Sequence, residues 1–224
     1  MLRSRSTLGS RAAVLFGMVG FMWIVHLVRA ALPGEVSVVH GIFPRSQAGL
    51  VGILTAPFLH ADFDHLISNS APLLILGALI LLGGMKQFLV VVQLVILIAG
   101  AGTWLFGSPN SHHIGASGIV FGFIGFLFFR SFFDRRISSF VLTVIVAFLY
   151  GGAIGLAVLP EEGISWSGHI FGFIGGFAAA KFIGGSRPSP VALSAGEKAY
   201  SEAEVEKWMG EVEEMRRKIA RERN

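Results

Sequence analysis

Four polar side chains lie within long apolar stretches of the sequence, where such groups are rare and usually functional. They are a serine, a histidine and a His/Asn pair: Ser117, His169, His65 and Asn69. A serine hydroxyl becomes a nucleophile when a neighbouring base takes its proton, and neutral histidine can accept that proton near pH 7. The oxyanion that then forms needs hydrogen-bond donors, for which His65, the Asn69 amide and the Ser117 backbone N–H are candidates.

The elements that must position these residues are predicted to cross a membrane. The 224 residues are 53% hydrophobic and 14% charged, whereas a soluble domain carries about 25% charged residues. This composition excludes a soluble enzyme, a disordered chain and a protein that binds nucleic acid through a basic face. Because the chain has no cysteine, disulfides, thiolate metal sites and a cysteine nucleophile are excluded as well.

Six apolar runs approach the 20 or so residues that a helix needs to cross a bilayer. They are 12–32, 64–82, 87–106, 115–131, 138–158 and 168–184. Basic residues are enriched in cytoplasmic loops, and a cytoplasmic N-terminus leaves only Arg29 and Arg45 outside. We therefore predict an all-α, six-span bundle in the cell membrane with both termini cytoplasmic. Asp62 and Asp64 are expected to cap the second run.

The polar residues are predicted to lie at one depth. Ser117, Asn69 and His169 are each 12–14 residues from the inner end of their span, or about 20 Å at 1.5 Å per residue. In a bilayer core of about 30 Å, all three then lie about 10 Å below the outer surface. No carboxylate of the sequence is expected at this depth, so the pattern predicts a Ser–His dyad without a third member.

Glycines at four-residue steps predict close contact between the spans that carry the serine and the histidine. They are Gly118 and Gly122 on the fourth span, and Gly168, Gly172 and Gly176 on the sixth. Small residues at this spacing let helix backbones approach each other in membranes. Packing alone would explain them, but they adjoin the serine and the histidine, so contact would bring the hydroxyl within reach of the imidazole.

Three motifs on alternate spans resemble those of the rhomboid intramembrane serine proteases. They are His65-x-x-x-Asn69 in the second span, Gly115-Ala116-Ser117-Gly118 opening the fourth, and Gly168-His169 followed by Gly172, Gly175 and Gly176 in the sixth. Each motif alone is weak, whereas the three together, in this order and at one depth, are specific. The resemblance covers roughly residues 12–184.

This resemblance implies roles for individual residues. It implies Ser117 as the nucleophile, His169 as the general base, and His65 and Asn69 as donors to the oxyanion. It also implies that the site is shaped by five further residues: Gly115, Gly118, Phe121, Gly168 and Gly172. Substrates of the family are expected to be single-span proteins that enter between the second and fifth spans. The first outer loop, residues 33–63, departs from the family because it lacks a Trp-Arg pair found in many members.

Five other polar residues are interpreted as structural or as contacts to substrate. His60, His112 and His113 are predicted to lie in outer loops near the site, where a metal cluster is one interpretation. The metalloprotease signature H-E-x-x-H is absent, so we expect neither a metal nor another cofactor. His26 and Gln93 are lone polar groups in the first and third spans, and we expect them inside the bundle or near an interface.

The chain is predicted to comprise four segments. They are a cytoplasmic N-terminal segment, the six-span protease domain, a linker and a charged amphipathic helix, at 1–11, 12–184, 185–195 and 196–224. The last segment has a narrow apolar stripe formed by Val205, Trp208, Val212, Met215 and Ile219. Self-association, contact with the membrane surface and a solvated helix without a partner remain open for it.

Together these patterns predict an intramembrane serine endopeptidase that cuts transmembrane helices of membrane proteins near the outer face. The expected partners are transmembrane substrates and the lipid bilayer, with no nucleic acid. Two other classes of protein fit the sequence less well. A catalytically silent rhomboid-like protein that binds transmembrane clients would not need both Ser117 and His169. A small transporter or channel would need internal repeats or charged residues along a path, and the sequence has neither.

Overall fold

Helices make up nearly all of the regular structure in a computed structural model, which describes residues 8–31, 41–156 and 165–184. The helices are α1 (Leu8–Ala31), α2 (Gly52–Thr55), α3 (Phe63–Leu81), α4 (Met85–Phe106), α5 (Ser117–Asp134), α6 (Ile137–Leu156) and α7 (Trp166–Gly184). Within these described ranges, the only β-type pairing is an isolated bridge between Ile42 and His113. The predicted all-α class is therefore confirmed.

Each of the six predicted spans coincides with one long helix. Four of them, α1, α3, α4 and α5, are long and apolar enough to cross a membrane. Neither α6 nor α7 is in this group, so the count of six spans stays a prediction. The predicted linker (185–195) and charged helix (196–224) lie outside the described residues, as do the first seven residues of the N-terminal segment.

The start of α5 differs from the predicted start of the fourth span by two residues. Gly115 has a φ of +110°, a left-handed conformation that glycine adopts at little cost. The chain therefore turns at Gly115, and the carbonyl of Ala116 accepts the first helical bonds from Ile119 (2.8 Å) and Val120 (3.0 Å). As a result, Ser117 is the first residue of α5.

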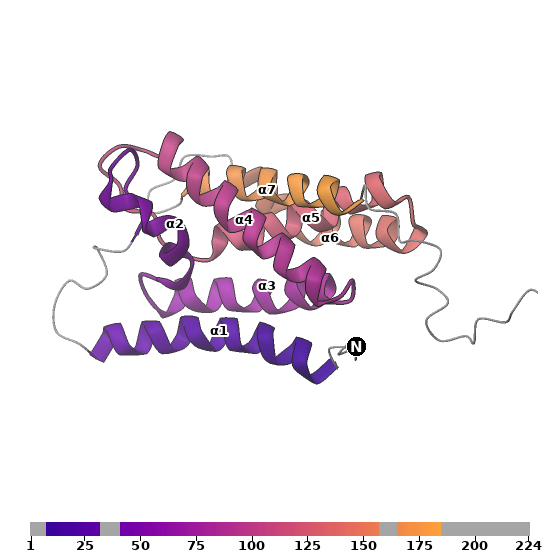
Figure 1. Ribbon diagram of the computed structural model, residues 1–224, viewed down its shortest axis with the longest axis horizontal. Coiled ribbons are helices and arrows are strands. Elements are labelled where there is room, and N and C mark those ends of the chain that lie inside the picture. The colour runs from indigo at the N-terminus through magenta and orange to yellow at the C-terminus, as the bar shows by residue number, and fades with distance from the viewer. Residues whose placement is uncertain (1–7, 32–40, 157–164, 185–224) are drawn as a thin grey trace, which may run out of the picture. The chain divides into compact units, whose positions relative to one another are not determined.

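Three helices pack together through glycines, and α7 lies beside α4 and α5 (Figure 1). A methyl group added to Gly172 of α7 would lie 2.2 Å from the carbonyl oxygen of Gly118 in α5. One added to Gly176 would lie 2.1 Å from the carbonyl oxygen of Gly122. The two glycine series thus place the backbones of α5 and α7 in direct contact. On the other side of the bundle, α1 lies alongside α3.

Residues 41–62, which precede α3, are structured, although the sequence interpretation treated them only as part of an outer loop. This segment contains α2 between two short 3-10 helices, Ala48–Leu50 and Ala56–Phe58. The segment is tied to the end of α4, because Trp104 Nε1 donates to the Ser46 carbonyl (2.8 Å). Arg45 Nη1 donates to the carbonyls of Leu105 (2.9 Å) and Gly107 (3.1 Å). These bonds hold the loop against the bundle without a Trp-Arg pair.

Candidate active site

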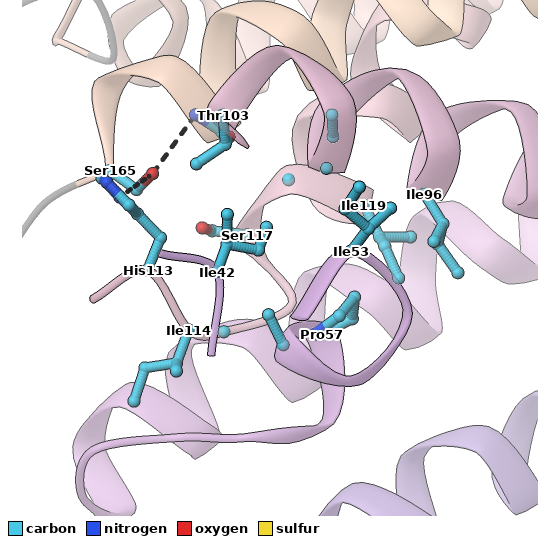
Figure 2. A pocket seen from close by; sticks show the side chains of 16 residues that line it. Ile42, Ile53, Pro57, Ile96, Thr103, His113, Ile114, Ser117, Ile119 and Ser165 are labelled. Atoms are coloured by element: carbon cyan, nitrogen blue, oxygen red, sulfur yellow. Dashed lines mark hydrogen bonds between the residues drawn. The ribbon is translucent and has the colours of Figure 1, made fainter. Parts of the chain in front are cut away.

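Ser117 opens α5 beside a cavity of ≈ 40 Å³. A cavity needs only about 10–15 Å³ by this measure to hold one water molecule. Figure 2 shows Ser117 in the middle of the lining residues, with His113 and Ser165 on one side and Ile53 on the other. The hydroxyl therefore borders a space that water-sized molecules can occupy.

His169 lies in the first turns of α7, on the helix that contacts the start of α5. A methyl group added to Gly118 would lie 3.3 Å from the carbonyl oxygen of Gly168, so the chain next to Ser117 meets the chain next to His169. The imidazole stacks on the ring of Phe121, with the centroids 4.2 Å apart and the planes at 23°. Phe121 follows Ser117 by one helical turn, so the His169 imidazole stacks on a side chain of the helix that begins with Ser117.

The His169 imidazole is buried, and its Nδ1 atom has no hydrogen-bond partner. Among the described residues, no hydrogen bond joins the imidazole to the Ser117 hydroxyl. In enzymes such a bond is often long before substrate binds and shortens in the reacting complex. The structure thus brings the two predicted residues onto contacting turns of α5 and α7.

His65 is placed against the turn that leads into Ser117. A methyl group added to Gly115 would lie 2.6 Å from His65 Nε2, so only glycine leaves room for the ring at this approach. Of the two predicted caps of α3, Asp62 is confirmed, because its Oδ1 accepts from the His65 backbone N–H (2.7 Å), whereas Asp64 lies within the first turn. This cap fixes the first turn of α3 and with it the position of the His65 side chain.

Asn69 is buried one turn further along α3. Its Nδ2 atom donates to the carbonyl of His65 (2.8 Å). An amide nitrogen carries two hydrogens, so one donor is used within the helix and one remains. Asn69 therefore supports the turn that carries His65 and keeps a donor for a further acceptor.

His60 was predicted to lie in a loop near the site, and the structure gives it a contact there that the sequence interpretation did not predict. The residue is fully buried, and its Nε2 atom accepts from the Ala116 backbone N–H (3.3 Å). Its ring centroid is 5.1 Å from that of His65. Burial, with the neighbouring His65, lowers the pKa of His60 to about 4. A neutral ring can keep accepting at Nε2, so His60 holds the residue before Ser117.

His113 links the loop before α5 to the start of α7. Hydrogen bonds join its Nδ1 atom to Ser165 Oγ (2.8 Å) and its Nε2 atom to Ser111 Oγ (2.8 Å). Ser165 Oγ in turn accepts from the Gly168 backbone N–H (3.2 Å), which is a helix N-cap interaction (Figure 2). Burial lowers the pKa of His113. These bonds fix the turn of α7 that carries His169.

Three further polar residues were named from the sequence: His112, His26 and Gln93. Within the described stretches of the chain, no group of three His, Asp or Glu side chains could hold a metal ion. His112 packs against Phe43, with ring centroids 3.6 Å apart. His26 is buried against Phe63, in agreement with the prediction, but Gln93 is exposed on α4 rather than inside the bundle.

The fold and the site define a multi-pass helical membrane protein with a serine and a histidine on contacting helices. The Rhomboid domain matches residues 47–186, so this chain belongs to the rhomboid family. An uncharacterized protein of Mycobacterium tuberculosis is 36% identical over 189 residues, which cover 81% of this chain and 78% of that protein. One of Mycobacterium leprae is 41% identical over 143 residues, covering 60% and 56%.

A relative with a stated activity is similar over a shorter region. The rhomboid protease GluP of Bacillus subtilis is 32% identical over 138 residues, which cover 59% of this chain and 26% of that protein. The family and this relative support intramembrane protease activity for the present chain. The matched residues 47–186 include α2 through α7, and therefore the whole candidate site.

Proposed function

We propose that this protein is an intramembrane serine endopeptidase in which Ser117 is the nucleophile and His169 the general base. The contact between α5 and α7 carries the proposal, because it joins the backbone beside the serine to the backbone beside the histidine. Membership of the rhomboid family and the similarity to the protease GluP agree with it.

In the proposed reaction, His169 accepts the Ser117 proton as the hydroxyl attacks the carbonyl carbon of the scissile peptide bond. The imidazolium then protonates the leaving amine, and the imidazole activates a water molecule that hydrolyses the acyl-enzyme. The cavity beside Ser117 is a route for that water. Membrane proteins tolerate such polar groups at depth only where protein or water satisfies them.

The oxyanion of the tetrahedral intermediate would form at the start of α5. The first backbone N–H groups of a helix have no partner within it and form its positive end. The Ala116 N–H is already bound to His60, so the Ser117 N–H is the proposed backbone donor. His65, packed against Gly115, and the remaining N–H of Asn69 are the proposed side-chain donors.

The proposed topology has six spans in the cell membrane and both termini in the cytoplasm. Support for α7 as a span comes from its packing along α5, which itself qualifies as one. Nineteen residues of α7 correspond to about 28 Å at 1.5 Å per residue. The site at the start of α5 would then lie toward the outside, and the charged segment 196–224 would be a cytoplasmic amphipathic helix.

Substrates in this proposal are single-span proteins whose helix unwinds near the outer face and enters between α3 and α6. The outer surface of α6 is apolar and exposed, as Phe148 (86%) and Leu149 (63%) illustrate. Such a surface suits contact with lipid or with a transmembrane helix.

Labelling with a fluorophosphonate probe tests the proposed nucleophile. We expect the purified protein to be labelled, and Ser117→Ala and His169→Ala to abolish labelling. Ser108→Ala removes an exposed hydroxyl in the loop before α5 and should be labelled like the wild type. Absence of labelling in wild-type protein that remains helical would contradict the proposal and favour a silent, client-binding rhomboid.

A further inference from the structure

A second cavity, with a volume of ≈ 400 Å³, lies at the other end of α5. It opens between the turn that joins α3 to α4 and the turn that joins α5 to α6. The 18 residues of α5 place it about 27 Å from the start of the helix, at 1.5 Å per residue. The cavity is therefore separate from the Ser117 site.

The charged side chains that line the cavity carry a net positive charge. Two arginines and one aspartate are the charged residues: Arg130, Arg136 and Asp134. The Asp134 carboxylate accepts three hydrogen bonds, and two of them are at Oδ2, from Arg130 Nε (2.9 Å) and Ser139 Oγ (2.7 Å). Its Oδ1 accepts from the Arg136 backbone N–H (3.1 Å). The aspartate thus orients the Arg130 side chain and has little acceptor capacity left for the Arg136 guanidinium.

Arg130 keeps donors that nothing in the protein uses. Its Nη1 atom is buried and has no hydrogen-bond partner, although its Nε atom is held by Asp134. The guanidinium carbon lies 5.7 Å from the centroid of the Phe126 ring, which restricts the side chain further. A buried guanidinium nitrogen without an acceptor is costly. The Arg130 side chain is 19% exposed and lines the cavity, so an anion there can approach the guanidinium from its open side, and a small shift of the side chain would give Nη1 an acceptor.

Arg136 and Ser138 provide exposed donors at the same rim. Among the described residues, neither side chain makes a hydrogen bond. Both can therefore turn toward an anion without breaking a bond in the protein. Arginine pairs with phosphate through two parallel N–H groups, which makes it well suited to this ligand.

The rest of the cavity wall is apolar and continues onto the exposed surface. It includes Leu82, Val141 and Ile145, whose side chains are 75%, 50% and 45% exposed. Contact with these apolar side chains would not stabilise bound inorganic phosphate. A molecule with a phosphate at one end and hydrocarbon at the other would match both regions of the cavity.

We propose that this cavity binds the phosphate group of an anionic membrane lipid through Arg130, Arg136 and Ser138. The acyl chains lie against Leu82, Val141 and Ile145, between the ends of α3 and α6. Basic pockets between transmembrane helices bind anionic headgroups in this way. The site does not depend on the protease proposal, because none of its residues belongs to the Ser117 site.

Native mass spectrometry of the full chain, titrated with phosphatidylglycerol or phosphatidylcholine in detergent, tests the site. We expect one phosphatidylglycerol to bind in preference to phosphatidylcholine. Arg136→Gln keeps the backbone bond to Asp134 but removes the charge, and should weaken phosphatidylglycerol binding about fivefold. Ser138→Glu places a negative charge at the rim and should weaken it at least as much.

Lys181→Gln is the matched control. Lys181 is exposed in the last turn of α7, at the same end of the bundle, and does not line the cavity. This variant should bind phosphatidylglycerol like the wild type. If Lys181→Gln weakened phosphatidylglycerol binding as much as Arg136→Gln, binding would reflect general charge attraction, and the proposed site would be wrong. Displacement of the lipid by excess inorganic phosphate would overturn the lipid as the ligand, and so would equal binding of both lipids.

Discussion

The His169 imidazole stacks on the Phe121 ring, with centroids 4.2 Å apart and planes at 23°. This contact orients the proposed base from the helix that also carries the proposed nucleophile. Because Phe121 follows Ser117 by one turn, any rotation of α5 moves the serine and the support of the histidine together.

Removing the aromatic support should slow the reaction without unfolding the protein. An aromatic pair contributes about 0.5–1.5 kcal/mol beyond its buried area, so Phe121→Leu should lower kcat by about twofold to tenfold. Phe132→Leu, at the exposed far end of α5 (64% exposed), is the control and should leave kcat unchanged. Cleavage of a single-span substrate in liposomes measures both variants. Equal kcat values for the two would show that the stacking does not serve the base.

The contact between α5 and α7 predicts a large effect from one methyl group. In Gly172→Ala, the added methyl would lie 2.2 Å from the Gly118 carbonyl oxygen and force the helices apart. Overpacking of this kind costs about 1–3 kcal/mol, and probe labelling of Ser117 should fall with it. Thermal unfolding in detergent and fluorophosphonate labelling report the two effects.

Gly151→Ala provides the contrast for this variant. A methyl group at Gly151 of α6 would meet nothing within 4 Å. Alanine in a helix interior is favoured over glycine by about 0.5–1 kcal/mol, so unfolding should occur at the same or a higher temperature. If Gly172→Ala behaved like Gly151→Ala, the close packing of α5 and α7 would be wrong.

His60 predicts a loss of stability in acid. Its pKa is about 4 in the folded protein and about 6.5 when unfolded. Between these values the unfolded state binds more protons, so stability is highest above pH 6.5 and falls as the pH decreases toward 4. The slope from this residue is at most about 1.4 kcal/mol per pH unit. Unfolding midpoints from pH 7.5 to 4.5 measure it.

A substitution of His60 that keeps a hydrogen-bond acceptor but cannot be protonated isolates this effect. His60→Gln can still accept from the Ala116 N–H, so its stability should depend less on pH than that of the wild type. His112→Gln, at an exposed histidine, should retain the wild-type dependence. His60→Leu leaves the Ala116 N–H unsatisfied and should lose about 1–3 kcal/mol at pH 7.5. Parallel curves for wild type and His60→Gln would refute the assignment.

The cap at Ser165 should matter for both stability and catalysis. Ser165→Ala removes the acceptor of the Gly168 N–H and the partner of His113 Nδ1, at a cost of about 1 kcal/mol. Because Gly168 precedes His169, kcat should also decrease. Ser165→Thr keeps the hydroxyl and should restore most of both quantities. If Ser165→Ala left kcat unchanged, the cap would not contribute to the position of His169.

The helices could be predicted because length and hydropathy are local properties of the chain. All six predicted spans coincide with helices, and the glycine spacing correctly predicted that the fourth and sixth would touch. The boundary at Ser117 was missed by two residues, since it depends on the positive φ of Gly115. Nothing in a hydropathy pattern reports that backbone angle.

Long-range polar contacts were less predictable. His60 precedes α3, and its role depends on a bond to Ala116, 56 residues later in the chain. The link from His113 to Ser165 spans 52 residues. Helix periodicity does not reveal either of these contacts. Of the two positions predicted for Gln93, the one inside the bundle was wrong for a related reason, because residue type alone does not say which face of α4 meets the bundle.

The joint between α5 and α7 combines backbone contacts at glycines with aromatic side chains of both helices, such as Phe121 against His169 and Phe129 against Phe177. At the glycines one main chain meets the other directly, so the spacing of the proposed nucleophile and base depends on the peptide backbone as well as on side chains. We therefore expect substitutions on the lipid-facing surfaces of either helix to adapt the protein to bilayers of other thickness or composition without moving Ser117 relative to His169.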